Sequence, residues 1–358
     1  MNYIFVHLLN DMSGSPRVLS DLIKNFPKSG EKYLLTSCRD GFLDTNDVNN
    51  FIKIPYVLFS NKYSKLLMYV LSQFYVFIRL SLTLVFLKIN NQKSTVVVNT
   101  LLPFGAAFSA KLFADRTIYY VHETSISPRP LNKLLTAVAF LTADKVIFVS
   151  YYVRSFHSKL SDKVDNAVIY NALRSDFKRD IEHSNRKKFK DKHILYVGTL
   201  KKYKGIHNFL LLARMMPDRD FVAAVNADVH EFDRFLKQYS IPKNLLLKRR
   251  PRNLEGLYID ALFTLNLSLP NLWVETFGLT LLESMQCSVP VIAPNHGGPK
   301  EVVNEFVGFL VEPSDVSCIK DIILGISEAS WKNMSSNAYE HSLKFSMQNY
   351  IQQISRVI

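Results

Sequence analysis

The feature that most constrains the fold of this chain is an alternation of short apolar runs with helical segments, and it occurs twice. The first series extends from "YIFVHLL" at 3–9 to "DKVIFVS" at 144–150, and the second from "HILYVGTL" at 193–200 to "GFLVE" at 308–312. The runs are rich in β-branched and aromatic residues and end at turn residues, as buried strands do. Because strands that alternate with helices form parallel sheets, two α/β units are expected.

The length and charge of the chain narrow its possible partners. Its 358 residues fit two domains, and the polar, basic stretch at 175–192 is interpreted as the linker region. The 44 Lys and Arg against 31 Asp and Glu give a formal net charge of +13. This favours an anionic partner such as nucleic acid, a phosphorylated small molecule or an acidic membrane face, although a solvated basic surface gives the same balance. No RNP, OB or helix-turn-helix pattern is present, so no nucleic acid is expected.

The cysteines and the N-terminus bear on the compartment. Cys38, Cys287 and Cys318 are scattered and form no C-x-x-C pair, so neither a disulfide framework nor a zinc site is expected, and a reducing compartment fits. The N-terminal "MNYIFVHLL" lacks the basic region and cleavage site of a secretory signal, and it is interpreted as the first strand.

The stretch "KLLMYVLSQFYVFIRLSLTLVFLKIN" at 65–90 is apolar over an unusual length. That length would permit a membrane span, but Arg79 near its centre makes a span costly. Its flanks are basic and aromatic residues recur along it, which favours an amphipathic helix on an anionic membrane face. An ordinary buried helix is the third possibility, and the sequence leaves all three open.

Three loops that follow expected strands carry residues suited to a ligand, since the crevices of open α/β sheets form there. Gly14 removes a Cβ at the start of a helix, where an anion or a hydroxyl is favoured. His122 follows "TIYYV" and can donate to a sugar hydroxyl or a phosphate oxygen. Lys201, Lys202 and Lys204 precede a helix, where ammonium groups can hold a diphosphate. A structural turn, a structural histidine and a solvated basic turn are the plainer explanations.

Two glutamates bracket the apolar run in "WVETFGLTLLES" at 273–284. A buried helix needs neither Glu275 nor Glu283, and each costs several kcal/mol if it is left unpaired away from water. If a helix begins near Gly278, its N–H groups suit a phosphate or a sugar hydroxyl, and the carboxylates suit paired hydroxyls. A ligand would then supply the polar partners that a helix core lacks.

At this point the sequence resembles the retaining GT-B glycosyltransferases of family 4, the glycosyl transferases group 1. "ETFGLTLLE" matches that family's E-x7-E motif, "YVGTLKKYKG" its first loop of the second domain, and "APNHGGPKEVV" its Gly-Gly-x-x-Glu stretch. "VIYNAL" matches the segment that opens the second domain, and "GFLVEPSD" a later G-x-L-V-x-P. The match is continuous over roughly 190–320 and looser in the N-terminal half.

The resemblance implies an α/β fold of the GT-B type, with two Rossmann-like parallel-sheet domains that face a central cleft. Residues 1–168 would bind the acceptor and residues 169–338 the nucleotide sugar. A C-terminal helix at 339–358 would pack back on the N-terminal domain.

The resemblance also implies that His122, Glu275 and Lys204 are catalytic and that further residues bind the donor. Glu283 would bind ribose hydroxyls, Glu275 a hexose hydroxyl, and Lys204 the diphosphate. His122 would face the donor sugar, and Gly14 would lie where the first glycine-rich loop approaches the donor and acceptor. The remaining donor contacts would come from Thr199, Lys201, Phe277, Gly278 and Leu279.

The sequence departs from the family at a few positions. The family often has Arg where this chain has Thr199, and Lys201 is a poorer substitute because a lysine cannot form a bidentate clamp. Ala172 replaces a frequent glycine, and "AAVNADV" lacks glycines common after that strand, which leaves the nucleobase pocket open. "DRD" at 218–220 formally matches a metal-binding D-x-D, but it falls in a helix-to-strand turn and is discounted. Neither a metal nor another cofactor is expected.

The expected function is therefore a retaining hexosyltransferase of bacterial surface polysaccharide synthesis, acting without a metal by front-face substitution. Its partners would be a nucleotide-diphosphate sugar as donor, a lipid-linked or growing saccharide as acceptor, and an anionic membrane surface. It would be cytoplasmic and peripheral on the inner face of the cell membrane. The alternative is a non-catalytic subunit that binds sugar nucleotide or lipid within a polysaccharide-assembly complex.

Overall fold

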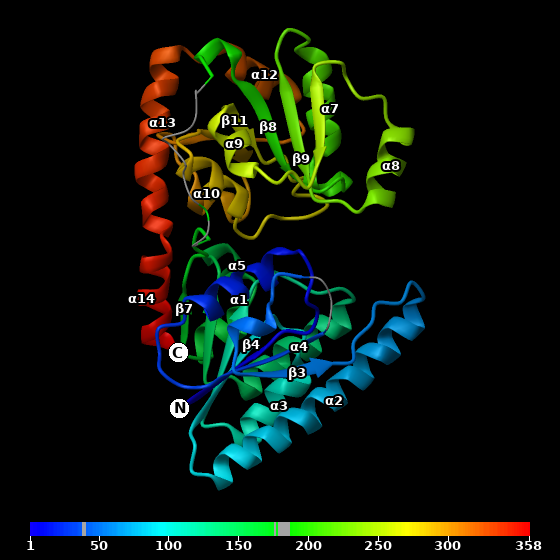
Figure 1. Ribbon diagram of the computed structural model, residues 1–358, viewed down its shortest axis with the longest axis vertical. Coiled ribbons are helices and arrows are strands. Elements are labelled where there is room, and N and C mark those ends of the chain that lie inside the picture. Colours follow the sequence, from blue (N-terminus) through cyan, green and yellow to red (C-terminus); the bar gives the residue numbers. More distant parts are fainter. Residues whose placement is uncertain (38–40, 175–176, 178–186) are drawn as a thin grey trace. The chain divides into compact units, whose positions relative to one another are not determined.

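The structure is a computed structural model that describes residues 1–37, 41–174, 177 and 187–358. The chain divides into two compact units, and each is built around one sheet (Figure 1). The first unit comprises Met1–Ala172 and Met347–Ile358, and the second comprises Leu173–Ser346. Both sheets are parallel, which confirms the α/β class expected from the alternation of runs.

The first sheet has seven strands in the order β3-β2-β1-β4-β5-β6-β7. Their bounds are β1 Asn2–Val6, β2 Lys32–Ser37, β3 Asn50–Ile54, β4 Ser94–Asn99, β5 Arg116–Val121, β6 Lys145–Phe148 and β7 Asn166–Val168. The helices of this unit are α1 Gly14–Lys24, α2 Lys62–Ile89, α3 Phe104–Phe113, α4 Arg129–Thr142, α5 Tyr151–Ser155, α6 Ser158–Lys163 and α14 Met347–Val357, with a 3-10 turn, η1, at Thr45–Asp47.

The second sheet has six strands in the order β10-β9-β8-β11-β12-β13. Their bounds are β8 His193–Gly198, β9 Phe221–Val225, β10 Leu245–Arg249, β11 Ala261–Leu265, β12 Val291–Pro294 and β13 Gly308–Val311. The helices are α7 Ile206–Met215, α8 Val229–Gln238, α9 Leu254–Ile259, α10 Leu279–Gln286, α11 Pro299–Val302, α12 Val316–Gly325 and α13 Glu328–Ser342. Three 3-10 turns, η2 Phe189–Asp191, η3 Lys202–Lys204 and η4 Leu343–Phe345, complete the unit.

Several central strands are buried along their whole length because helices cover both faces of each sheet. Every residue of β1, β4, β9 and β11 is buried. In the second unit, Phe209 and Phe263 belong to the larger core cluster, while Leu195, Tyr258 and Cys287 belong to a separate, smaller one. Strands of this kind read as continuous apolar runs, which is why they stand out in the sequence.

Each sheet contains one point at which the order of its strands reverses. In the first sheet it lies between β1 and β4, and in the second between β8 and β11. Open α/β sheets bind ligands outside the carboxyl ends of the strands at such a point. The loops after these four strands are therefore the places to look for a site.

The apolar stretch at 65–90 forms most of one helix, α2, which the side chain of Asn61 caps at its start. It packs against α3 in the first unit, and Figure 1 shows the two helices on the same side of the sheet. Among the described helices, α2 is long and apolar enough to cross a membrane by length and composition, with 33% of its apolar window buried.

Some sequence expectations fall on other parts of the chain. Cys38 and most of the expected linker at 175–192 lie outside the described residues. Phe177 within that stretch is described and belongs to the smaller core cluster of the second unit. The terminal segment at 339–358 contains the end of α13, then η4, then α14. Cys287 is buried and Cys318 is exposed, and neither forms a disulfide with a described residue.

Candidate functional site

Lys204 and Glu275 form an ion pair at the carboxyl edge of the second sheet. Lys204 ends η3, the turn after β8, and Glu275 lies in the loop between β11 and α10; the Nζ–Oε2 distance is 2.6 Å. Asn266 Nδ2 and Ser268 Oγ, just after β11, lie 3.5 and 3.4 Å from the same oxygen. Since the strand order reverses between β8 and β11, the pair lies where such sheets bind ligands.

Glu275 is ionised at neutral pH. Burial raises its pKa, but the Lys204 ammonium and hydrogen bonds from Lys204, Asn266 and Ser268 outweigh burial and hold the pKa below its ordinary value. The side chains of Lys204 and Glu275 keep 23% and 18% of their area exposed. Within the described part of the chain no donor contacts Oε1 of Glu275, so this oxygen can accept a hydrogen bond from a ligand hydroxyl.

Glycines hold the backbone around this pair in conformations that other residues rarely adopt. Gly205, after Lys204, has φ 79°, and a Cβ there would collide with the carbonyl of Leu267. Gly278, before α10, has φ 104°. Both are in the left-handed region, where a side chain is strained.

The Gly-Gly pair of the "APNHGGPKEVV" stretch packs closely against the backbone of the Glu275 loop. The Gly298 N–H donates to the Glu275 carbonyl at 2.9 Å. A Cβ on Gly297 would collide with the Glu275 carbonyl, and a Cβ on Gly298 with the Thr276 carbonyl. These two glycines therefore allow one loop to lie directly against another.

Helix α10 begins directly after Gly278, as the sequence predicts, with Leu279 as its first residue. Among the described residues no side chain caps this helix start. Its first N–H groups and the positive end of its dipole can therefore receive an anion. Phe277, before it, is buried at 2% exposure with its ring centroid 6.1 Å from that of Phe345, which anchors the loop.

Glu283 lies one turn into α10 and its carboxylate is held by protein groups. The Tyr258 hydroxyl donates to Oε2 at 2.9 Å, and Arg174 Nε lies 3.3 Å from Oε1. Arg174 also donates to Glu255 at 2.9 Å. The sequence argument left the partners of both glutamates to a ligand; the structure instead supplies Lys204 for Glu275, and Tyr258 with Arg174 for Glu283.

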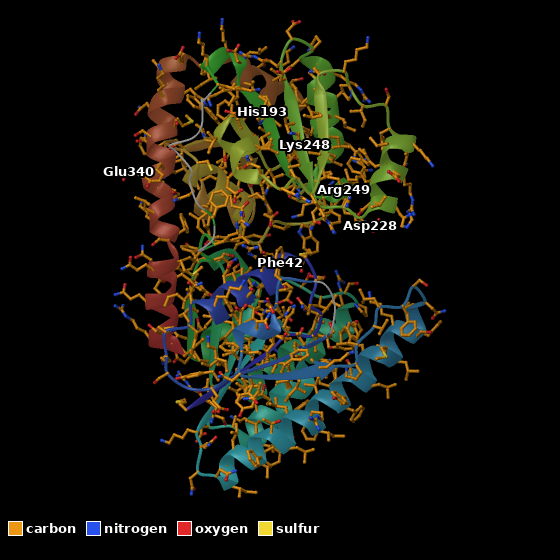
Figure 2. All side chains as sticks on the ribbon, viewed as in Figure 1. Phe42, His193, Asp228, Lys248, Arg249 and Glu340 are labelled. Atoms are coloured by element: carbon orange, nitrogen blue, oxygen red, sulfur yellow. The ribbon has the colours of Figure 1, made fainter. Side chains whose placement is uncertain are left out.

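Thr199 and Lys201 follow β8 but do not take part in the Lys204–Glu275 pair. The Thr199 carbonyl accepts from the Tyr196 hydroxyl at 2.8 Å, which fixes the loop. Lys201 Nζ binds Glu231 on α8 at 2.7 Å, and that bond raises its pKa. Asp228 after β9, which caps α8, and Arg249 at the end of β10 mark the same carboxyl edge in Figure 2.

His122 belongs to a hydrogen-bonded chain at the reversal point of the first sheet. Its Nε2 donates to Asn99 Oδ1 at 2.9 Å, and Asn99 Nδ2 donates to His7 Nδ1 at 3.0 Å. These residues follow or end β5, β4 and β1. Burial lowers the pKa of His7 to about 4 and that of His122 to about 3, with further lowering at His122 from His7, so both rings are neutral. The Nδ1 lone pair of His122 is then an acceptor, while its Nε2 proton is already donated.

Glu123, directly after His122, is the carboxyl group of this region. Burial raises its pKa to about 7, against hydrogen bonds from the N–H groups of His122, Glu123 and Leu101 and from the Thr100 hydroxyl. Its carbonyl accepts from His157 Nε2 at 2.8 Å. The group therefore changes charge near neutral pH.

Gly14 opens α1, after the loop that follows β1. A Cβ there would meet open space, and the packing of the described residues does not require glycine at this position. Ser15, the next residue, accepts from Asn99 Nδ2 through its carbonyl at 3.2 Å, which ties the helix start to the His122 chain. Farther along, the Arg17 guanidinium lies 4.8 Å from the ring centroid of Phe42, labelled in Figure 2.

The sequence did not predict the roles of several residues of these sites. A Glu after the His of "YYVHE" could have drawn attention to Glu123. Asn99 ends a strand in "VVVNT" and Asn266 follows one in "FTLNLS", and a polar residue at the carboxyl end of an apolar run is the pattern they share. Arg174 and Tyr258 lie far from Glu283 in sequence, so no local pattern reveals them.

The two parallel sheets place the chain in the α/β class, and the second sheet has an ion pair beside the start of α10. Residues 177–341 match the model of the family "Glycosyl transferases group 1", which covers nearly all of the second unit. The second unit thus resembles the group 1 glycosyltransferases, and the chain has a fold of the GT-B type.

Known relatives agree with this family. The chain is 27% identical over 231 residues to an uncharacterized glycosyltransferase of Methanocaldococcus jannaschii, covering 61% of this chain and 60% of that one. It is 27% identical over 237 residues to N-acetyl-alpha-D-glucosaminyl L-malate synthase of Bacillus anthracis, covering 63% and 61%. The match thus spans about three fifths of each relative's length.

The fold matches over the whole chain. The crystal structure of Anabaena HepE in complex with UDP superimposes with a TM-score of 0.75 at 18% identity, covering 100% of this chain and 99% of that one.

Proposed function

We propose that this protein is a retaining hexosyltransferase that moves a hexose from a nucleotide-diphosphate sugar to a lipid-linked or growing saccharide acceptor in bacterial surface polysaccharide synthesis. The observation that carries the proposal is the Lys204–Glu275 pair, 2.6 Å apart, beside the uncapped start of α10. An ammonium and a helix N-terminus suit a diphosphate, and a carboxylate with a free oxygen suits a sugar hydroxyl.

The second unit would bind the donor. The Lys204 ammonium would also bind the diphosphate. The diphosphate oxygens would accept hydrogen bonds from the first N–H groups of α10. Oε1 of Glu275 would accept from a hexose hydroxyl, and Glu283 from the ribose. Because Tyr258 and Arg174 already orient the Glu283 carboxylate, it would be held ready for those hydroxyls.

The transfer would break the bond from the anomeric carbon to the departing phosphate oxygen and form one to the acceptor oxygen on the same face. The departing phosphate oxygen would take the acceptor's proton, so no protein carboxylate need act as nucleophile. Lys204 and the helix N-terminus would stabilise the charge that develops on the diphosphate, and no metal is required in this scheme.

The first unit would contribute His122. Its Nδ1 would accept from a hydroxyl of the transferred hexose, because Asn99 holds Nε2–H. Anabaena HepE has crystal structures in complex with UDP, with UDP and glucose, and with UDP-glucose, which supports a nucleotide-sugar donor here. Cytoplasmic placement on the inner face of the cell membrane would bring the enzyme to a lipid-linked acceptor.

Transfer of a radiolabelled hexose from nucleotide sugars to lipid-linked oligosaccharide acceptors tests the proposal. Glu275→Gln and Lys204→Met should each lower kcat by about a hundred- to a thousandfold. Lys202→Met, in the same turn, is the matched control and should retain turnover. The anomeric coupling constant of the product, measured by NMR, should show retention.

The alternative, a non-catalytic subunit that binds sugar nucleotide or lipid, makes the opposite prediction. Wild-type protein would then bind a nucleotide sugar and release no product with any acceptor. Transfer that persists at the wild-type rate in Glu275→Gln would instead show that this pair is not the site.

A further inference from the structure

Helix α2 buries two polar side chains, Ser72 and Gln73, against the first unit, while many of its apolar side chains are exposed. Ser72 and Gln73 are 1% exposed, and Gln73 accepts from the Gly105 N–H of α3 at 3.1 Å. The Tyr69 hydroxyl donates to the Leu102 carbonyl at 2.7 Å. A surface helix in water instead has a mainly polar outward face, so the outward face of α2 needs an explanation.

The outward face of α2 is an apolar stripe as long as the helix. Its members recur at intervals of three or four residues, which places them on one side, opposite the buried residues Val76, Leu80 and Leu84. Their exposed fractions run from 54% to 75%, and side chains stand out along α2 in Figure 2. The stripe consists of Leu67, Leu71, Phe74, Ile78, Leu82, Phe86 and Ile89.

The stripe continues onto neighbouring segments. Val57, Leu58 and Phe59, just before α2, are 52%, 38% and 47% exposed. Phe108 and Leu112 on α3, the helix that packs against α2, are 41% and 61% exposed. A group of exposed apolar side chains of this size on neighbouring segments indicates an interaction site.

The charges around the stripe indicate what kind of partner binds it. From Val48 to Ala114 the sequence has no Asp or Glu, but it has seven basic residues: Lys53, Lys62, Lys65, Arg79, Lys88, Lys93 and Lys111. Lys62 and Lys65 lie at the start of α2 and Lys88 at its end, and all three are exposed. An apolar face flanked by basic side chains fits the boundary between acyl chains and anionic headgroups.

We propose that the outward stripe of α2 seats in one leaflet of an anionic bilayer, with Lys62, Lys65 and Lys88 on the headgroups. The helix lies on the membrane and does not cross it, because its other face packs on α3 and hydrogen-bonds there. A second copy of the chain is a poor partner for the stripe, since it would bring two sets of the basic residues Lys62, Lys65 and Lys88 together.

This inference deepens the proposed function, whose lipid-linked acceptor would lie in that leaflet. Membrane binding is nevertheless measured without turnover, so the two can fail separately. Vesicle binding without sugar transfer would refute only the proposed function, and transfer to a soluble acceptor without vesicle binding would refute only the docking.

Co-sedimentation of the full chain with phosphatidylglycerol-containing vesicles tests the docking. The triple variant Leu71→Glu, Ile78→Glu, Leu82→Glu should bind at least about a hundredfold more weakly. The variant Lys62→Gln, Lys65→Gln, Lys88→Gln should bind about ten- to a hundredfold more weakly, and so should wild type on neutral phosphatidylcholine vesicles or at high salt.

Matched controls use equally exposed residues of the second unit. Two triple variants should bind as wild type does: one carries Val229→Glu, Leu246→Glu and Leu324→Glu, and the other Lys188→Gln, Lys237→Gln and Lys243→Gln. Unchanged binding of the Leu71/Ile78/Leu82 triple variant would overturn the proposal. A wild-type dimer that this variant converts to monomer, without vesicle binding, would overturn it in favour of a second copy.

A depth measurement guards against variants that fail to fold. The fluorescence that Phe74→Trp adds to that of the native Trp273 and Trp331 should be quenched by lipids brominated on the acyl chain. The fluorescence added by Phe306→Trp, on the second unit with a 61% exposed native side chain, should not. Equal quenching at both positions, or none at either, would contradict seating of the α2 stripe.

Discussion

In the described site the Lys204 ammonium faces one protein carboxylate, that of Glu275. In the proposed function it also binds the diphosphate when the donor is present. Its Nζ lies 2.6 Å from Glu275, and Asn266 and Ser268 are weaker donors at 3.4 to 3.5 Å. The lysine is therefore the main counter-charge of a largely buried carboxylate. Removing it leaves that carboxylate without its strongest partner.

We expect Lys204→Met to destabilise the second unit by about 1 to 3 kcal/mol at pH 7. The folded pKa of Glu275 lies below its ordinary 4.5, so the pairing stabilises above that pH and is lost as pH falls through the folded pKa. The difference between variant and wild type should therefore shrink below about pH 4.5. Urea unfolding followed by tryptophan fluorescence measures it, because Trp273 and Trp331 both lie in the second unit.

Lys202→Met serves as the control for the turn itself and should change stability little. If the deficit of Lys204→Met were as large at pH 4 as at pH 7, the ion pair would not be its cause.

Glu123 gives the first unit the opposite pH dependence. Burial raises its pKa from 4.5 to about 7, so the folded protein keeps a proton that the unfolded chain has lost. The contribution to stability is present below about pH 4.5 and is lost as pH rises to about 7. Glu123→Gln should therefore be more stable than wild type at pH 8 by up to about 3 kcal/mol, and equal to it near pH 4.5.

Hydrogen exchange of peptides from β4 and β5 measures this in the first unit. Glu31→Gln is the matched control because its native side chain is exposed, and its exchange should follow wild type. A Glu123→Gln variant that loses stability equally at both pH values would show that the carboxyl group acts through packing alone.

At the scale of elements, the sequence predicted the second sheet better than the first. All six strands of the second sheet lie within apolar runs that stand out by composition. In the first sheet, β3 (Asn50–Ile54) and β7 (Asn166–Val168) were missed. Asn50, Phe51, Ile52 and all of β7 are only partly buried, so these end strands lack the continuous apolar character that marks central ones.

The candidate site was predictable to the extent that it is local in sequence. Lys204, Glu275 and Gly278 each lie in a short polar or glycine-containing loop after or before an apolar run, and the structure brings Lys204 and Glu275 together. The partners of Glu283 were not predictable in this way. Arg174 and Tyr258 reach it from 109 and 25 residues away in sequence, and only the folding of the sheet sets such distances.

Helix α2 shows a limit of a different kind. Its sequence is apolar on every side, so the pattern does not distinguish a buried helix from a membrane-facing one. What separates them is which side chains the rest of the unit covers. The structure buries Ser72 and Gln73 and exposes Phe74 and Ile78, and no pattern in the sequence alone sets that rotation.

At the scale of the whole molecule, charge and tryptophan divide unequally between the units. The first unit carries 20 Lys and Arg against 11 Asp and Glu, so it holds most of the net charge of +13. Both tryptophans belong to the second unit, and Trp273 lies two residues before Glu275, with its ring centroid 5.5 Å from that of Tyr203. One intrinsic probe thus reports on the unit that the proposed function assigns to the donor.

A nucleotide sugar that fits should therefore raise the thermal midpoint reported by tryptophan fluorescence. At a hundredfold excess over Kd a ligand specific to the folded state stabilises it by about 2.7 kcal/mol. We expect one nucleotide class among UDP-, GDP-, ADP- and dTDP-sugars to do this, with hydrogen-exchange protection concentrated at 198–205 and 275–280. Lys204→Met should lose the shift and Lys202→Met should keep it, because only the former removes the charge beside the start of α10. Stabilisation by every nucleotide alike, with protection spread over the basic surface of the first unit, would instead mean that net charge and not the Lys204–Glu275 site binds them.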